Sequence, residues 1–335
     1  MRALFQRRVS GDDTLLRLAE LRFRQAGLAA EVYAGSPSEL EHVLGLVPSH
    51  RDAPVVHLDR NVNVLDGHSR ERVAEFARRF AGRVWGLVFH DKTAMASRGD
   101  ELVVALRELD AIGRGAAATP YLFLEYAAGV EPERFVELAE RVRDTEHVSM
   151  CIDVGHVGIR QARRHFARVH PDLDLAALTP RDPRLPELVD DVRDAVATAL
   201  PTVLELTRSL RRIGKPVHFP LHDGHPLIPG LSDHFSFLTE VAIPFCDHGR
   251  WSLPSLYGPT GLAHIVDEAT YPNGGGLSSL TLEIHQAEGR LPLGDAEELF
   301  AHWSDRANAE RMNYWLAVLV QNSLLIRGAT ESATC

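Results

Sequence analysis

Carboxylates and imidazoles recur in this sequence at one kind of place, the end of a short apolar run. The polar residues in these positions are His57, His90, Glu125, Asp153, His218, His222, Glu283 and His285. Oxygen and imidazole donors suit Mn²⁺, Mg²⁺, Co²⁺ or Zn²⁺. Carboxylates brought together repel one another unless a cation or protons neutralise them. If these side chains meet in space, the sequence predicts a site for a divalent metal.

Asp153-Val154-Gly155-His156 is the most specific local element. It predicts an aspartate at a strand end and a histidine in the turn above it, with the glycine permitting a tight turn. The other polar residues have plainer explanations when each is taken alone. A strand-end carboxylate can cap the following helix or pair with an arginine, and a histidine can hydrogen-bond within the rim. Convergence of the whole set is what favours the metal.

The elements that must position these residues alternate along the chain. Apolar runs predict strands at 2–8, 29–34, 54–59, 84–90, 121–126, 148–153, 216–222 and 279–285. Amphipathic patterns predict helices at 12–26, 36–47, 70–81, 100–113, 131–143, 186–213 and 295–326. Strands that alternate with helices favour parallel pairing through right-handed crossovers. The first strand fits least well, because its arginines are too polar for a barrel interior.

This alternation predicts an α/β fold, a (β/α)8 TIM barrel formed by a single domain, 1–335, with a long C-terminal helix at 295–326. Long insertions are expected after strands six and seven, at 157–215 and 223–278. Barrel enzymes carry their active site at the carboxyl ends of the strands. The polar strand ends should therefore form one rim.

Composition excludes several classes of protein. The chain has 335 residues, a formal net charge of −10 and three cysteines without a CxxC pair. The negative net charge and the spread of the arginines, which mostly stand beside acidic residues, disfavour a nucleic-acid partner, because phosphate backbones are bound by clustered Lys and Arg. An odd cysteine count fits a reducing compartment, and the first residues show no signal peptide. Apolar runs are too short to span a membrane. We expect a cytoplasmic enzyme with a small-molecule substrate, and the sequence leaves a homo-oligomer open as an alternative to a monomer.

Ordered motifs give the chain a wider resemblance. They are HLDRNVN at 57–63, FHDK at 89–92, FLEY at 123–126, CIDVGH at 151–156, HFPLHDG at 218–224, DHFSF at 233–237 and LEIH at 282–285. In this order the chain resembles the xylose isomerase-like TIM barrels. That superfamily holds sugar phosphate isomerases and epimerases and the AP endonuclease family 2, which includes endonuclease IV. The resemblance runs from about strand three to the last helix.

The resemblance implies a set of site residues. In the epimerases one metal is bound by Glu, Asp, His and Glu from strands five to eight, which correspond to Glu125, Asp153, a strand-seven histidine and Glu283. The usual strand-seven position holds Pro220 here, so His218 or His222 takes over, and we favour His222 as nearer the rim. Glu125 and Glu283 would be catalytic. The predicted substrate-binding residues are His57, His90, His156, His218 and His234.

Three functions follow from this reading. The first is a metal-dependent isomerase or epimerase that transfers a proton at a carbon next to the carbonyl of a sugar or polyol ketone. The second is a multi-zinc hydrolase or lyase of the endonuclease IV type, acting on a small phosphorylated or glycosidic substrate. His57, His90, His156 and His234 resemble the additional histidines of that branch, whereas Ser232 replaces an expected aspartate. The third is a carbohydrate-binding subunit without catalysis.

Overall fold

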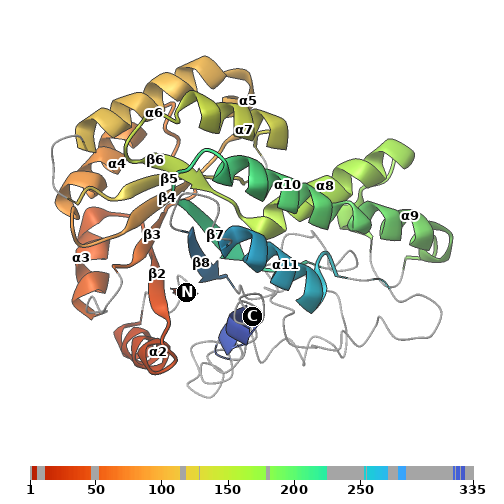
Figure 1. Ribbon diagram of the computed structural model, residues 1–335, viewed down its shortest axis with the longest axis horizontal. Coiled ribbons are helices and arrows are strands. Elements are labelled where there is room, and N and C mark those ends of the chain that lie inside the picture. Colours follow the sequence, from red (N-terminus) through yellow and green to blue (C-terminus); the bar gives the residue numbers. More distant parts are fainter. Residues whose placement is uncertain are drawn as a thin grey trace. The chain divides into compact units, whose positions relative to one another are not determined.

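The strands of the chain form a barrel (Figure 1). The computed structural model describes residues 2–5, 12–46, 53–113, 118–127, 129–178, 182–224, 253, 255–270, 278–283, 320, 322–324 and 326–328. The strands are β1 Arg2–Phe5, β2 Ala29–Ala34, β3 Val55–Leu58, β4 Gly86–His90, β5 Tyr121–Glu125, β6 Val148–Cys151, β7 Val217–Leu221 and β8 Ser278–Leu282. They follow chain order around a closed barrel.

Every neighbouring pair from β1 to β7 is parallel. Parallel neighbours require the chain to return through a crossover, and helices fill these crossovers. The structure thus confirms an α/β fold in which parallel strands form a barrel, compatible with a TIM-like fold. The interior is apolar at one level, where Val55, Val88, Phe123 and Cys151 pack together.

The helices are α2 Asp13–Gln25, α3 Pro37–Leu46, α4 Gly67–Arg79, α5 Thr93–Ser97, α6 Gly99–Gly113, α7 Pro132–Arg141, α8 Val154–Val169, α9 Leu185–Ala197, α10 Ala199–Arg211 and α11 Gly258–Thr270, with a short 3-10 turn at Leu175–Ala177. Local chemistry sets several of their starts. The Asp12 carboxylate accepts hydrogen bonds from the backbone N–H groups of Thr14 and Leu15, at 2.9 and 3.0 Å, and so caps α2. Pro132 begins α7, where its missing N–H is no loss.

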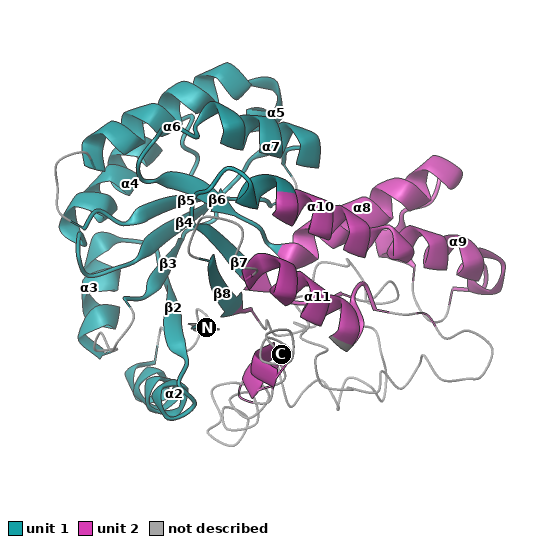
Figure 2. Cartoon of the chain, viewed as in Figure 1, with its two compact units in different colours: residues 1–153, 209–219, 272–281 teal, residues 154–208, 220–271, 282–335 magenta. Residues whose placement is uncertain are grey.

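The chain divides into two compact units (Figure 2). Unit 1 comprises residues 1–153, 209–219 and 272–281, and holds β1 to β6 with α2 to α7. Unit 2 comprises residues 154–208, 220–271 and 282–335, and holds α8, α9 and α11. The two units alternate along the chain, because the last strands of the barrel come after helices that belong to unit 2. The organisation as one domain over 1–335 stays a prediction.

Two expectations about the connections were wrong. The helix predicted at 186–213 is two helices, α9 and α10, which meet at Thr198. The turn predicted above Asp153 is the first turn of helix α8, which begins at Val154. The long connection expected at 223–278 contains α11. Of the helix predicted at 295–326, the described residues 320, 322–324 and 326 are helical, and the remainder lies outside the described residues.

The contacts of Arg2 explain how strand β1 can carry an arginine. Its side chain is buried, and its guanidinium lies 4.9 Å from the centroid of the Trp85 ring. One guanidinium nitrogen donates to the Ser279 hydroxyl, and the other donates to the Ala53 carbonyl at 3.2 Å. A desolvated cation over an indole face is stabilised by the ring quadrupole. Two of the guanidinium nitrogens therefore have hydrogen-bond partners inside the barrel.

Candidate metal centre in unit 1

The alternation of side chains along the strands determines which residues form the site. Residues two apart on a strand point to the same face. Moving two residues on from the apolar layer of Val55, Val88, Phe123 and Cys151 gives His57, His90, Glu125 and Asp153. The next layer toward the carboxyl ends of β3 to β6 is therefore made of two imidazoles and two carboxylates. It lies where barrel enzymes carry their chemistry.

Three of these side chains converge on one point. The Nε2 atoms of His57 and His90 are 3.3 Å apart. Glu125 Oε2 lies 3.2 Å from Nε2 of His57 and 3.7 Å from Nε2 of His90. The rings of the two histidines are tilted by 53° with centroids 4.9 Å apart, so they face each other at an angle rather than stack. All three ligand atoms point inward to a shared space.

Asp153 adds a second carboxylate beside this group. Ligand oxygens of Glu125 and Asp153 lie within 4.8 Å of one another, as the sequence predicts for two groups that share an ion. Both residues are buried, with exposed fractions of 1% and 0%. The charge of Asp153 raises the pKa of Glu125, as a neighbouring anion must. Two buried carboxylates this close need positive charge between or beside them.

The imidazoles supply part of that charge. Burial raises the pKa of Glu125, but the attraction of His90 and His57 outweighs it and brings the pKa to about 2. Burial lowers the pKa of His57, and its contacts with Glu125 and Glu31 reverse this and raise the pKa well above the usual range. Glu125 is thus held as a carboxylate, the state in which it can bind a cation.

Glu31 is a residue that the sequence analysis missed. It lies on β2, is fully buried, and its Oε1 is 3.1 Å from Nδ1 of His57. Burial raises its pKa, and the attraction and hydrogen bonds of His218 and His57 more than reverse this. A signal was present in the sequence, because a glutamate inside the apolar run AAEVYA has to find a polar partner within the barrel.

The two candidate strand-seven histidines belong to different surroundings. His218 is fully buried in unit 1, and its Nε2 lies 2.9 Å from Oε2 of Glu31. His222 is buried in unit 2, where its ring meets that of His156 edge to face with centroids 5.8 Å apart. Which of them binds a metal stays a prediction.

Gly155 is needed for space rather than for a turn. It lies in the first turn of α8, and a β-carbon there would come within 1.7 Å of Cε1 of His222. This close approach corrects the expectation that the glycine permits a tight turn. Only a residue without a side chain leaves room for the imidazole.

The remaining predicted residues lie at the end of β8 and beyond the described ranges. Glu283 is buried directly after β8, and its backbone N–H donates to the Leu221 carbonyl at 3.1 Å. His234 and His285 lie outside the described residues. The assignments of Glu283, His222, His156 and His234 to catalysis, metal binding or substrate binding therefore stay predictions.

The donor set of unit 1 fits a divalent metal. For bonds of about 2.0–2.1 Å, tetrahedral ligand atoms are about 3.3–3.4 Å apart. The distances of 3.3, 3.2 and 3.7 Å among His57, His90 and Glu125 are close to this spacing. His57 also contacts a carboxylate through Nδ1, which is the usual arrangement behind a metal-binding histidine. Zn²⁺ and Mn²⁺ suit such a mixed set.

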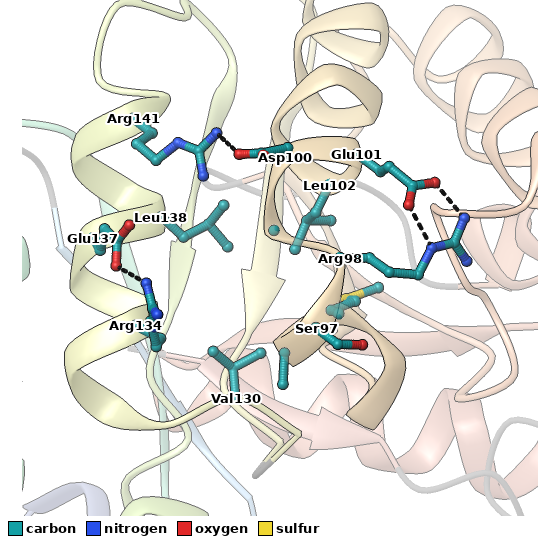
Figure 3. A pocket seen from close by; sticks show the side chains of 13 residues that line it. Ser97, Arg98, Asp100, Glu101, Leu102, Val130, Arg134, Glu137, Leu138 and Arg141 are labelled. Atoms are coloured by element: carbon teal, nitrogen blue, oxygen red, sulfur yellow. Dashed lines mark hydrogen bonds and ion pairs between the residues drawn. The ribbon is translucent and has the colours of Figure 1, made fainter.

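A surface groove on unit 1 has a different character (Figure 3). It is lined by α5, α6, α7 and Val130. Its charged side chains form the ion pairs Arg98–Glu101, Arg134–Glu137 and Arg141–Asp100. Each arginine that lines the groove faces an acid, so the groove carries no excess of either sign. These pairs lie on solvent-exposed faces of the helices.

No protein-family model matches this sequence, and the search of curated proteins finds no match either. The resemblance to the xylose isomerase-like barrels therefore depends on the motifs. Among the residues that the structure describes, none of the helices has the length and apolar character needed to cross a membrane.

Proposed function

We propose that this protein is a metal-dependent enzyme of the xylose isomerase-like barrels that acts on a small sugar-like substrate. The observation that carries the proposal is the convergence of His57, His90 and Glu125, whose ligand atoms lie within 4.8 Å of one another. Each comes from a different strand, and alternation turns all of them toward the barrel interior. A purely apolar layer would be the more stable filling at this level, so a buried polar layer favours a function.

The first reaction that we propose is isomerisation or epimerisation at a carbon next to a carbonyl. A bound divalent ion would polarise the carbonyl and its neighbouring hydroxyl. Glu125 and Glu283 would then remove and return the proton, with Asp153 and His222 completing the binding set. The buried carboxylates of Glu125 and Glu283 support this reading, because a site that excludes water protects a proton in transfer.

A second reaction is favoured by one specific contact. His57 and His90 both face Oε2 of Glu125, so Glu125 is better placed as a ligand than as a free base. In a multi-zinc hydrolase or lyase, these histidines would hold an ion in addition to the one at Asp153 and Glu283. Such an enzyme would act on a small phosphorylated or glycosidic substrate. A carbohydrate-binding subunit without catalysis is the third possibility.

Metal content tests the proposal and separates the reactions. Protein purified without chelator should contain about one divalent ion per chain if it is an epimerase, and two or three if it is a hydrolase. The double variant His57→Ala, His90→Ala should lose one ion in the second case and none in the first. His264→Gln is the matched control, since His264 is exposed on α11. A wild-type chain that binds no metal would refute the proposal.

A further inference from the structure

Glu31 is held from three sides inside the barrel. Its Oε2 accepts hydrogen bonds from Nε2 of His218, at 2.9 Å, and from the Thr281 hydroxyl, at 2.6 Å. Its Oε1 lies 3.1 Å from Nδ1 of His57. All four residues are buried, with exposed fractions of 0% for Glu31, His218 and Thr281 and 2% for His57. They come from strands β2, β3, β7 and β8, so the network links strands near the start of the chain to strands near its end.

This arrangement has a direct consequence for His57. A carboxylate can only accept, so the Glu31–His57 contact requires a proton on Nδ1 of His57. The other ring nitrogen, Nε2, is the atom that faces His90 and Glu125. By the same rule its contact with the Glu125 carboxylate requires a proton on Nε2 as long as no metal ion takes that place. Because both oxygens of Glu31 are engaged, the carboxylate cannot turn, and it fixes the plane of the imidazole as well as its proton.

We propose that Glu31 is a positioning residue for the metal centre, which keeps Nε2 of His57 directed at His90 and Glu125 and is itself held by His218 and Thr281. The inference rests on the proposed function, and within it on the reading in which His57 and His90 hold an ion. It also gives His218 a place behind the ligands, below the layer that substrate would reach. Carboxylates behind metal-binding histidines orient the ring and raise its basicity, and their loss typically weakens metal binding by about 10–100-fold.

Variants at Glu31 test its contribution to metal affinity. Glu31→Met keeps much of the volume and removes both acceptor oxygens, and we expect Zn²⁺ or Mn²⁺ affinity to fall by about 10–100-fold. Glu31→Gln keeps one carbonyl oxygen, so its affinity should lie between those of the wild type and Glu31→Met. Ser149→Ala is the matched control: it removes a buried hydroxyl of β6 that bonds the Pro216 carbonyl, away from the site. It should lower stability and leave the affinity unchanged.

Nitrogen-15 spectra of the histidine rings test the positioning part without any metal. In the wild type, Nδ1 of His57 should carry a proton, with the signal assigned by its disappearance in His57→Gln. In Glu31→Met this proton should no longer be fixed, and the ring should populate the form with the proton on Nε2. This readout would not change if Glu31 merely filled the core.

The outcomes separate this inference from the proposed function. If the wild type binds no metal but His57 is protonated at Nδ1 and Glu31→Met releases that proton, the proposed function fails and only the orientation of the His57 ring by Glu31 stands. If Nδ1 of wild-type His57 carries no proton, the inference is overturned, whether or not the Glu31 variants fold. Wild-type metal affinity in a folded Glu31→Met variant would also overturn it.

Discussion

Glu283 is the residue on which the proton-transfer reaction depends most. It lies buried directly after β8, two residues beyond Thr281, and alternation turns both toward the same face. Thr281 bonds Glu31, and the sequence motifs predict a catalytic role for Glu283.

Replacing Glu283 by glutamine should abolish turnover while the fold and most metal binding remain. Glutamine keeps an oxygen donor but cannot take up a proton from substrate at neutral pH. Loss of an acid/base group typically lowers the rate by about 10²–10⁴-fold. The measurement is deuterium incorporation from D₂O into a panel of ketoses, followed beside metal content. Glu133→Gln, at an exposed position on α7, is the control and should react like the wild type. A normal rate in metal-loaded Glu283→Gln would remove Glu283 from the chemistry.

Lys215 gives a prediction about pH that does not involve the metal centre. Its ammonium donates to the Val142 carbonyl at 3.1 Å and to the Thr145 hydroxyl at 2.7 Å. Burial lowers its pKa from 10.5 to about 8, against the smaller opposing influence of Asp110 and Asp144. At a pH between these two pKa values, Lys215 holds its proton in the unfolded chain and has released it in the folded chain.

The free energy of unfolding should therefore contain a contribution that rises with pH from about 8 to 10.5. Below pH 8 both states are charged and the penalty for burying the ammonium is fully present. In Lys215→Met this contribution should vanish, which urea unfolding at several pH values would measure. An identical pH slope in Lys215→Met and wild type would contradict the prediction.

At the scale of elements, the start of α8 depends on the small size of Gly155. The helix follows β6 almost directly, which brings its first turn against His222 within unit 2. Tyr257 closes the same region by donating its hydroxyl proton to the Val154 carbonyl.

Gly155→Ala should destabilise the protein by about 1–3 kcal/mol, because the added methyl group must displace the imidazole or the helix. Gly45→Ala is the matched control, since Gly45 is also helical and a β-carbon there has no atom within 4 Å. That variant should be neutral or more stable by up to about 1 kcal/mol. Chemical unfolding of both measures the difference. Equal stabilities of the two variants would show that His222 does not occupy this space.

The same two elements show where sequence reasoning succeeded and failed. The apolar run VSMCID correctly predicts strand β6, and Asp153 lies two residues beyond the end of that strand. Helix α8 was missed because two glycines and a histidine at its start are typical of a turn. Its buried side chains, among them Val154, Val157, Ala162 and Phe166, nevertheless recur at helical spacing. Only the packing against His222 explains why a glycine stands inside a helix.

At the scale of the molecule, the order of strands and helices was predictable, because it depends on the spacing of apolar residues along the chain and on the length of each apolar run. The grouping of His57, His90 and Glu125 was predictable from strand ends once a barrel was assumed. The partners behind them were not, because Glu31 and His218 are separated by 187 positions and meet only through the closed sheet. The contacts of Arg2 were missed for the same reason, since the sequence gives no sign that Trp85 and Ser279 lie beside it.

Metal binding should stabilise the whole protein. A ligand that binds only the folded state adds about 2.7 kcal/mol at 100 times its dissociation constant. We expect Zn²⁺ or Mn²⁺ to raise the Tm by several degrees over that in chelator, because the ion would compensate the buried carboxylates. Thermal unfolding with metal and with chelator measures this. The double variant His57→Ala, His90→Ala should show a smaller rise if the two histidines hold an ion, and the wild-type rise if they do not. Equal Tm values for the wild type in both conditions would contradict the prediction.

Arg2 has a consequence for synthesis of the chain. Its hydrogen-bond partner Ser279 is 277 positions away, so the contact cannot form until that residue has left the ribosome. At about 5–20 residues per second, this takes about 14–55 s. During that time β1 has an unpaired edge, which is open to pairing with other chains. A polar, charged residue at the start of β1 makes such pairing less favourable, so Arg2 would protect the nascent protein before it takes its place beside Trp85.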